Sequence, residues 1–404
     1  MSAQTLLSDN QPLLPPGETI TTSLSRKRSY SIKVTSDESA SLQALMSELD
    51  GHAAAIITDH TVASLHGRRI ASALSDRGAL LDIISIAPGE RSKSLQTACH
   101  LLDQLANSRL GRRDVLIAIG GGVVIDTVGW VASAYMRGIP YINVPTTLLA
   151  QVDAAIGGKV AVDHVEAKNL IGGFYEPQAV VSCVGYLSTL PPRHVHAGLA
   201  EAIKAAVIAS PELFAYIELH LESILAKDRQ SLQRLVHGAS AVKCRLVERD
   251  PYEADLRRPL NFGHAIGHAI ETATGYGPVL HGEGVSIGMA AEIQMAVRRN
   301  LLSPMTAARV LDLLAAVNLP VTLKDLEHPP GIGRVIAGLA KVRQIRDGNL
   351  RFVLPVDLGS VLIADDVSEE EVRAALQGQL LQGQLTVPTA MDRTRAGTAD
   401  AAVS

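Results

Sequence analysis

The sequence predicts an α/β protein in which an N-terminal, mainly parallel α/β domain is followed by an all-helical domain. Two observations predict this fold. The first half of the chain alternates short β-branched runs with helical patterns, whereas from about Pro191 onward nearly every segment has helical periodicity. Strands that alternate with helices form parallel sheets with helices on both faces. With 404 residues, 47% of them hydrophobic, the chain has room for two domains.

The expected strands of the first domain are short apolar runs rich in Val, Ile and Leu. They are Tyr30–Val34, Ala54–Thr58, Leu81–Ile86, Val115–Ile119, Tyr141–Val144 and Ala179–Ser182. Helical segments such as Ser94–Asn107 and Thr127–Met136 lie between them. Because each strand is separated from the next by a crossover, we expect them to run parallel.

Helix signals dominate the second half. Ser210 and Pro211 are typical of a helix start, with proline in the first helical position. Ser368 and Glu371 form a capping-box pattern for a late helix. One extended segment, Leu350–Leu354, interrupts the helices. We expect a single strand there.

The change of pattern places a domain boundary near residues 183–191. We expect the first domain to cover residues 29–187 and the second to cover residues 188–385. Residues 1–28 are rich in Ser, Thr, Leu and Pro, and residues 386–404 are rich in Ala and Thr. Both ends are predicted to be disordered tails.

Composition narrows the choice of partners. The net charge of −4 gives no electrostatic reason to expect nucleic acid or an anionic membrane as a partner. No apolar run reaches the length of a membrane span. Cys99, Cys183 and Cys244 have neither metal-type nor redox-type spacing. We therefore expect reduced cysteines and a cytoplasmic protein.

A histidine-rich segment predicts a metal site. His264 and His268 are four residues apart and share one helix face, and His281 follows a Gly-rich loop. Upstream, Glu201 and Lys204 lie three apart in another apolar helix. Imidazoles and one carboxylate are the ligands of catalytic zinc sites. The alternative is a pair of satisfied core histidines. We favour the metal site because unpaired charges in apolar helices are costly to bury.

Glycines and hydroxyls after two strands predict a phosphate-bearing ligand. Strand Val115–Ile119 runs into three glycines, Gly120–Gly122, which let a backbone approach a pyrophosphate at a helix start. The alternative is that these glycines form only a tight loop, because they lack the G-x-G-x-x-G spacing of the usual dinucleotide-binding motif. Thr146 and Thr147 end the next strand. Lys159, Lys168 and Asn169 follow and suit a phosphorylated, polyhydroxyl ligand.

Seven motifs, in this order and spacing, resemble those of 3-dehydroquinate synthase and its sugar-phosphate cyclase relatives. They are GGGVVID, YMRG, VPTTLLAQVDAAIGGK, KNLIG, AGLAEAIK, LNFGHAIGHAIE and LHGE. The resemblance covers residues 30–360. It implies an NAD-binding α/β domain followed by a helical metal-binding domain, a homodimer, and NAD with zinc or cobalt as cofactors.

The resemblance also implies roles for individual residues. The implied metal ligands are Glu201, His264 and His281. The implied NAD contacts are Asp59, Glu90, Lys93, Gly121, Gly122, Asp126, Thr146, Thr147, Lys168 and Thr189. The implied phosphate contacts are Lys159, Asn169, Asn261, His268 and Arg137, the last reaching across the dimer interface. Lys243 and Arg257 match a pair that binds a substrate carboxylate, and Asp153, Lys204 and His268 match residues around the reacting groups.

The implied reaction converts a seven-carbon sugar phosphate to a carbocycle. One hydroxyl is oxidised, phosphate is eliminated, the hydride is returned, and an intramolecular aldol closes the ring. NAD is therefore not consumed. The two candidate substrates are 3-deoxy-arabino-heptulosonate 7-phosphate, which carries a carboxylate, and sedoheptulose 7-phosphate, which has none and gives valiolone-type cyclitols.

We expect the carboxylated substrate, and hence 3-dehydroquinate synthase activity of the shikimate pathway. This expectation rests on Lys243 and Arg257, because two buried cations would have no negative counter-charge if the substrate lacked a carboxylate. The sedoheptulose 7-phosphate cyclase is the alternative. It is favoured by the stretch Val342–Gly348, where Arg343 or Arg346 stands in for the usual phosphate-binding lysine, and by Arg193-His194. A second alternative is a metal-dependent alcohol or glycerol dehydrogenase, because these enzymes share the two-domain architecture.

Overall fold

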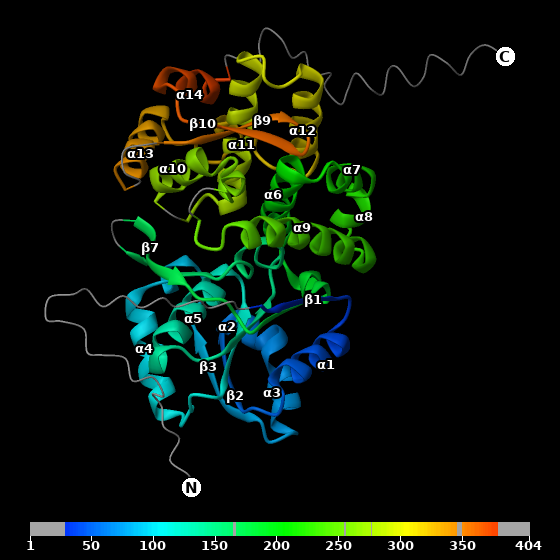
Figure 1. Cartoon of the computed structure of the whole chain (residues 1–404), viewed down its shortest axis with the longest axis vertical. Helices are drawn as coiled ribbons and strands as arrows, with labels where there is room; N and C mark the ends of the chain where they lie inside the picture. Colours follow the sequence, from blue (N-terminus) through cyan, green and yellow to red (C-terminus); the bar gives the residue numbers. More distant parts are fainter. Residues whose placement is uncertain (1–28, 165–166, 254–255, 276, 346–349, 379–404) are drawn as a thin grey trace, which may run out of the picture.

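The computed structural model describes residues 29–164, 167–253, 256–275, 277–345 and 350–378. The predicted tails, residues 1–28 and 386–404, lie outside the described residues. In the described part of the chain, a sheet flanked by helices forms one half of the molecule and helices form most of the other half (Figure 1). No helix in this part of the chain is long and apolar enough to cross a membrane.

A six-stranded parallel sheet organises the first half. Its strands are β1 (Ser31–Thr35), β2 (Ala54–Asp59), β3 (Leu80–Ile86), β4 (Val115–Gly120), β5 (Tyr141–Pro145) and β8 (Ala179–Cys183). They lie in the order β1-β8-β5-β4-β2-β3, and every neighbouring pair is parallel. The predicted strands and their direction are confirmed. Because the strands are parallel, their carboxyl ends meet at one edge of the sheet.

Helices cover both faces of this sheet. The helices of the first half are α1 (Glu38–Leu49), α2 (His60–Val62), α3 (Arg68–Ser75), α4 (Leu95–Asn107) and α5 (Gly122–Ala134). Leu45 of α1 and Leu74 of α3 pack on one face, whereas Leu101 of α4 and Val128 of α5 pack on the other. The predicted helix over 127–136 begins earlier, at Gly122, directly after the glycine turn.

An antiparallel hairpin lies where the sequence predicted only a polar ligand-binding stretch. It consists of β6 (Lys159–His164) and β7 (Ala167–Phe174). Most of β7 is exposed or half-buried, and Gly172 and Gly173 interrupt its side-chain pattern. Alternating hydrophobicity, the usual signal for a strand, is therefore weak in this segment.

The second half is mainly helical. Its helices are α6 (Pro192–Ala209), α7 (Pro211–Leu219), α8 (Leu221–Leu225), α9 (Arg229–Arg249), α10 (His264–Thr274), α11 (His281–Arg298), α12 (Pro304–Ala316), α13 (Ile332–Ile345) and α14 (Glu369–Leu376). Ser210 caps α7, and Ser368 with Glu371 forms the predicted capping box of α14.

The second half is not entirely helical, which corrects the sequence-based expectation. The predicted single strand is one arm of an antiparallel hairpin, β9 (Phe352–Asp357) and β10 (Ser360–Ala364). Phe352, Val353 and Leu354 are buried against the helices. A strand needs a hydrogen-bonding partner, and β10 supplies it.

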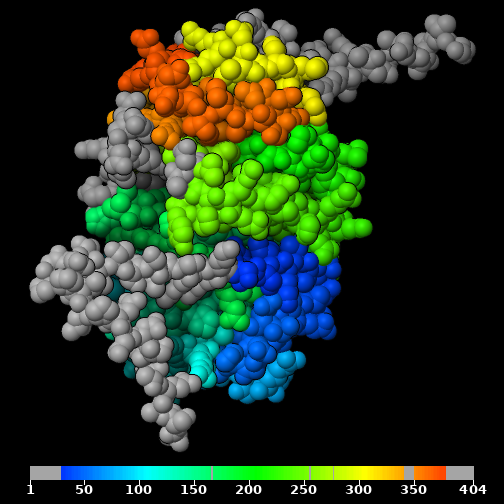
Figure 2. All heavy atoms as spheres, viewed as in Figure 1, coloured from blue at the N-terminus to red at the C-terminus, as the bar shows by residue number. Residues whose placement is uncertain are grey.

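The two halves are in direct contact. In the space-filling view the green helical residues sit directly on the blue N-terminal residues (Figure 2). The side chain of Gln233 in α9 donates a hydrogen bond of 2.9 Å to the carbonyl of Val34 in β1. The carboxyl edge of the sheet therefore lies beside the helical half.

Glycines allow three helices to pack unusually closely. A Cβ on Gly288 of α11 would lie 1.9 Å from the carbonyl oxygen of Gly263, which precedes α10. A Cβ on Gly282, at the start of α11, would lie 1.9 Å from the carbonyl oxygen of Ala197 in α6. Gly263 itself has a φ of 77°, a conformation that favours glycine. These contacts hold α6, α10 and α11 against one another.

A buried glutamate supports the start of α10. Glu292 of α11 is fully buried, and its Oε2 accepts a hydrogen bond of 2.9 Å from the backbone N–H of Gly263. Burial raises the pKa of Glu292 well above its ordinary value. The side chain acts here as a hydrogen-bond acceptor for the start of α10.

The first prediction concerns the close helix packing. We expect Gly288→Ala to destabilise the protein by about 2–3 kcal/mol, because the new methyl overlaps the Gly263 carbonyl and the backbones must separate. The matched control is Gly333→Ala in α13, where a Cβ would meet nothing within 4 Å. That change should be neutral or stabilise by about 0.5–1 kcal/mol. Urea unfolding of both variants measures this, and equal stabilities would contradict it.

The second prediction concerns the buried glutamate. A carboxyl whose pKa is raised by folding contributes most below its unfolded pKa, and its contribution is lost as the pH rises. Glu292→Gln keeps an acceptor for Gly263 and has no such loss. We therefore expect the variant to gain stability relative to the original protein between pH 5 and pH 8, by up to about 1.4 kcal/mol per pH unit. A stability difference that does not change with pH would show that Glu292 is already charged in the folded protein.

Candidate active site

The predicted metal ligands come together where α6, α10 and α11 meet. Glu201 of α6 is buried, and its Oε1 lies 3.4 Å from Nε2 of His281 in α11 and 3.6 Å from Nε2 of His264 in α10. Ligands about 2.0–2.1 Å from a tetrahedral zinc lie about 3.4 Å from one another. The donor spacing therefore fits a zinc ion.

The charges at this point also fit a cation. Burial raises the pKa of Glu201, but Lys204 and the two histidines outweigh it and hold that pKa well below its ordinary value. Burial and then Lys204 lower the pKa of His264 well below its ordinary value. A charged carboxylate and a neutral imidazole with a free lone pair are the forms that bind metal. Both Glu201 oxygens are buried. Oε2 is paired with Lys204, and Oε1 faces the two histidines.

His268 belongs to the same cluster. Its ring centre lies 5.4 Å from that of His264 and 5.6 Å from that of His281. One nitrogen from each of the three histidines can be chosen so that all lie within 4.8 Å of one another. The three imidazoles are thus a second candidate ligand set. The predicted set, in which Glu201 replaces His268, brings a negative charge that the three histidines lack.

Glu271 is a charged residue of this cluster to which the sequence analysis gave no role. It is buried in α10, and its Oε2 lies 3.4 Å from Nδ1 of His281. Burial lowers the pKa of His281, but the carboxylates of Glu271 and Glu201 outweigh it and raise that pKa to about 10. The signal was present in the spacing, because residues 264, 268 and 271 share one face of a helix.

The predicted cofactor contacts gather at the carboxyl edge of the sheet. Asp59 ends β2, Gly121 and Gly122 follow β4, and Thr146 and Thr147 follow β5. A Cβ on Gly121 would lie 3.0 Å from the side chain of Thr147, so only a glycine leaves the backbone open there. This edge is where parallel sheets bind dinucleotides.

Charged residues line the same edge. Lys93 Nζ lies 2.5 Å from Asp126 Oδ2, and Lys168 Nζ lies 2.8 Å from Glu90 Oε1. Burial raises the pKa of Asp126 although Lys93 opposes it. Thr189, the last of the predicted cofactor contacts, lies 3.0 Å from His66 through its hydroxyl.

The predicted carboxylate-binding cations have protein partners. Lys243 Nζ lies 2.7 Å from Asp153 Oδ1 and 2.5 Å from its carbonyl oxygen. Burial raises the pKa of Asp153, but Lys243 and Lys204 outweigh it and hold that pKa below its ordinary value. Arg257 is 2% exposed, donates a hydrogen bond of 3.0 Å to the Pro251 carbonyl and lies over the ring of Phe174.

Glu253, which sequence reasoning missed, connects Arg257 to the predicted phosphate contacts. Its Oε2 lies 2.5 Å from Lys159 Nζ and 3.7 Å from Arg257, and its Oε1 lies 3.5 Å from Asn261. No local motif marks this glutamate. The structure alone shows that a carboxylate of the protein lies among cations predicted to bind substrate.

Some predicted residues are not placed in this cluster. Arg137 is exposed at the end of a short helix and has a left-handed φ of 65°. Asn169 is exposed in β7, with a φ of 54°, and its backbone N–H donates to Asp163. The side chains of Arg343 and Arg346 lie outside the described part of the chain.

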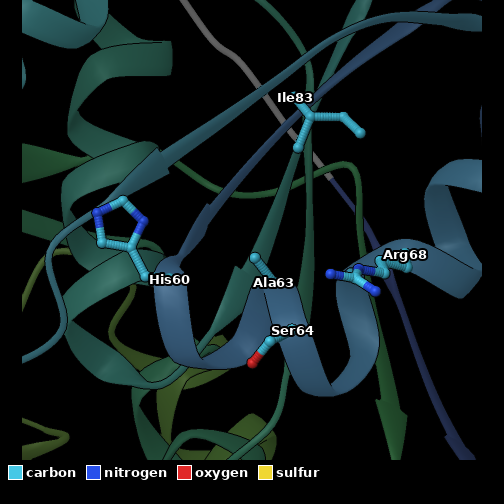
Figure 3. A pocket seen from close by; sticks show the side chains of 6 residues that line it. His60, Ala63, Ser64, Arg68 and Ile83 are labelled. Carbon is cyan, nitrogen blue, oxygen red and sulfur yellow. The ribbon is translucent and has the colours of Figure 1, made fainter.

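A hollow of about 260 Å³ lies elsewhere, beside the outer strand β3. His60, Ser64 and Arg68 line it from the segment after β2, and Ile83 lines it from β3 (Figure 3). None of its lining residues belongs to the predicted site. The hollow is therefore separate from the predicted site, which lies between the sheet edge and the helices.

Comparison with known proteins agrees with this arrangement. Residues 83–197 match the family model of the 3-dehydroquinate synthase N-terminal domain, and residues 198–336 match that of the C-terminal domain. The chain is 56% identical to 2-epi-valiolone synthase of Actinosynnema mirum, over 92% of this chain and 97% of that protein. It is 41% identical to 3-dehydroquinate synthase of Desulforamulus reducens, over 86% and 97% respectively.

A solved structure shares the whole fold. The 2-epi-5-epi-valiolone synthase of Streptomyces hygroscopicus, with NAD+ and Zn2+ bound, matches with a TM-score of 0.82 and 32% identity, covering 90% of this chain and 99% of that chain. The predicted family and fold class are thereby confirmed. This chain belongs to the 3-dehydroquinate synthase family of sugar-phosphate cyclases.

Proposed function

We propose that this protein cyclises sedoheptulose 7-phosphate to 2-epi-valiolone, with bound NAD and a divalent metal, zinc or cobalt. The observation that carries the proposal is the 56% identity to a 2-epi-valiolone synthase along nearly the whole of both chains. The 3-dehydroquinate synthase from Desulforamulus reducens is 41% identical. The comparisons thus favour the alternative of the sequence analysis over its first interpretation.

The structure weakens the argument on which the first interpretation rested. That argument assumed that only a substrate carboxylate could supply the negative counter-charge of Lys243 and Arg257. In the structure Asp153 binds Lys243, and Glu253 lies near Arg257. Protein carboxylates therefore supply the negative charge. A substrate without a carboxylate leaves neither cation without a counter-charge.

For the metal, we propose Glu201, His264 and His281 as ligands. The donor spacing and the charge states of Glu201 and His264 support this set. When bound, NAD and the metal would supply the reversible oxidation of one secondary hydroxyl of the sugar. Lys204 is paired with Glu201 and interacts electrostatically with Asp153, which supports a role for its ammonium group in orienting that hydroxyl.

For NAD, we propose the carboxyl edge of the sheet. The open backbone at Gly121 and the start of α5 offer N–H groups to a pyrophosphate. Asp126 and Lys93 form a charged pair at the same edge. These features support a dinucleotide bound at this edge.

For the sugar phosphate, we propose Lys159, Asn261 and His268 as contacts, with Asn169 and Arg137 from more exposed positions. Lys159 and Asn261 both contact Glu253, so an incoming phosphate would take over these two contacts and leave Glu253 beside Arg257. Arg137 follows Met136, and both have left-handed backbones. Such strain persists where it serves a contact, which supports a role for Arg137 at the interface of a homodimer.

A net dehydrogenase is the remaining alternative. Family membership argues against it, because both domains match the 3-dehydroquinate synthase family models and the 56% identical relative is a 2-epi-valiolone synthase. In the proposed reaction the hydride returns to the product, so NADH does not accumulate. A rise in NADH absorbance in step with product would favour the dehydrogenase.

The third prediction tests the substrate. We expect the protein to release phosphate from sedoheptulose 7-phosphate and to turn over 3-deoxy-arabino-heptulosonate 7-phosphate at least about 100-fold less efficiently, a difference of about 2.7 kcal/mol in the transition state. Phosphate release with each sugar, with identification of the carbocycle by mass spectrometry, measures this. Preferential use of the carboxylated sugar would restore 3-dehydroquinate synthase as the function.

The fourth prediction tests the metal set. We expect chelation to abolish turnover and His264→Ala to lose bound zinc, because the site would retain two of its three protein ligands. His237→Ala, on the exposed face of α9, is the matched control and should bind zinc normally. Metal analysis after dialysis compares the two variants. Stoichiometric zinc in His264→Ala would move the site to other residues.

A further inference from the structure

We infer that Glu271 is a positioning residue that links the metal ligands to the cofactor edge, so that metal and NAD bind cooperatively. The inference rests on the proposed metal and cofactor sites. It adds a residue and a coupling that neither the sequence analysis nor the comparisons assign.

The contacts of Glu271 are divided between the two halves of the molecule. Its Oε2 faces Nδ1 of His281 at 3.4 Å, within the helical half. Its Oε1 accepts from Lys168 Nζ at 3.1 Å, and Lys168 belongs to β7 of the sheet half. The same Nζ lies 2.8 Å from Glu90, which follows β3. Figure 1 shows β7 lying between the sheet and α10. Four side chains thus form one continuous chain of charges.

The contact between Glu271 and His281 determines which ring nitrogen of His281 is available to a metal. A metal that binds Nε2, which faces Glu201, would release the proton of that nitrogen and leave the other proton on Nδ1, which faces Glu271. The separation of 3.4 Å is long for a hydrogen bond, so the carboxylate orients the ring mainly through its charge. Carboxylates that hold a ligand histidine in this way raise metal affinity.

The contact with Lys168 carries the effect to the cofactor edge. Glu271 is almost fully buried and cannot remain charged there without a cation. Lys168 supplies part of that charge, and it is shared with Glu90. A dinucleotide that orders Glu90 and Lys168 would also order Glu271 and hence His281. Coupling between two sites is reciprocal, so metal would tighten NAD by the same factor.

The test measures binding, without any sugar. Zinc affinity of the full-length protein is measured by competition with a chelating dye, in the absence and in the presence of saturating NAD. We expect NAD to tighten zinc by at least about 5-fold in the original protein. Glu271→Gln should weaken zinc by about 10- to 100-fold and reduce the NAD effect to nearly nothing. Lys168→Met should remove the NAD effect while weakening zinc less.

Two controls separate positioning from general stability. Glu218→Gln changes a paired glutamate of the helical half, and Lys33→Met changes a paired lysine of the sheet half. Both should keep the original zinc affinity and NAD effect. Cobalt absorption gives a second readout, because a reoriented His281 should alter the visible spectrum of Glu271→Gln, whereas the spectrum of Glu218→Gln should stay unchanged.

The outcomes distinguish this inference from the proposed function. Original zinc affinity and an original NAD effect in Glu271→Gln would overturn the inference, even in a protein that cyclises sedoheptulose 7-phosphate. Failure with that sugar, combined with the expected binding results, would overturn only the proposed substrate. An original protein in which NAD leaves zinc affinity unchanged would also overturn the coupling.

Discussion

The close packing of α11 against α6 and α10 is the constraint on which the site depends. Gly282 and Gly288 let the backbone of α11 approach both neighbours at distances that any side chain would prevent. Glu201, His264 and His281 lie on these three helices, and their donor atoms meet only because the helix axes are so close. Packing in this protein therefore determines the geometry of its chemistry.

Alternating charges make such a buried site stable. Lys204 pairs with Glu201 and acts on Asp153, which in turn binds Lys243. Each charge has an opposite neighbour, so none is buried alone. A metal ion would add one more cation beside Glu201, whose Oε1 faces the two histidine ligands.

The sequence predicted the elements whose signals are local. Parallel strands such as Val115–Ile119 are continuous apolar runs, and the caps at Ser210 and Ser368 depend on neighbouring residues. It missed β6 with β7 and the second arm of the β9 hairpin, because pairing with a distant strand leaves little trace in an exposed or Gly-rich segment. Much of the candidate site came from the family resemblance. Glu253 could not, because its importance lies in contacts made only in the folded chain. Glu271 was missed although it shares a helix face with His264 and His268.

Substrate choice shows the same limit. Lys243 and Arg257 are compatible with a carboxylated sugar when they are considered alone, and the sequence offers no view of their surroundings. The fold places Asp153 beside Lys243 and Glu253 near Arg257, so both cations have a carboxylate of the protein as a neighbour. A set of cations therefore indicates an anionic substrate only where the protein itself supplies too few carboxylates to pair with them.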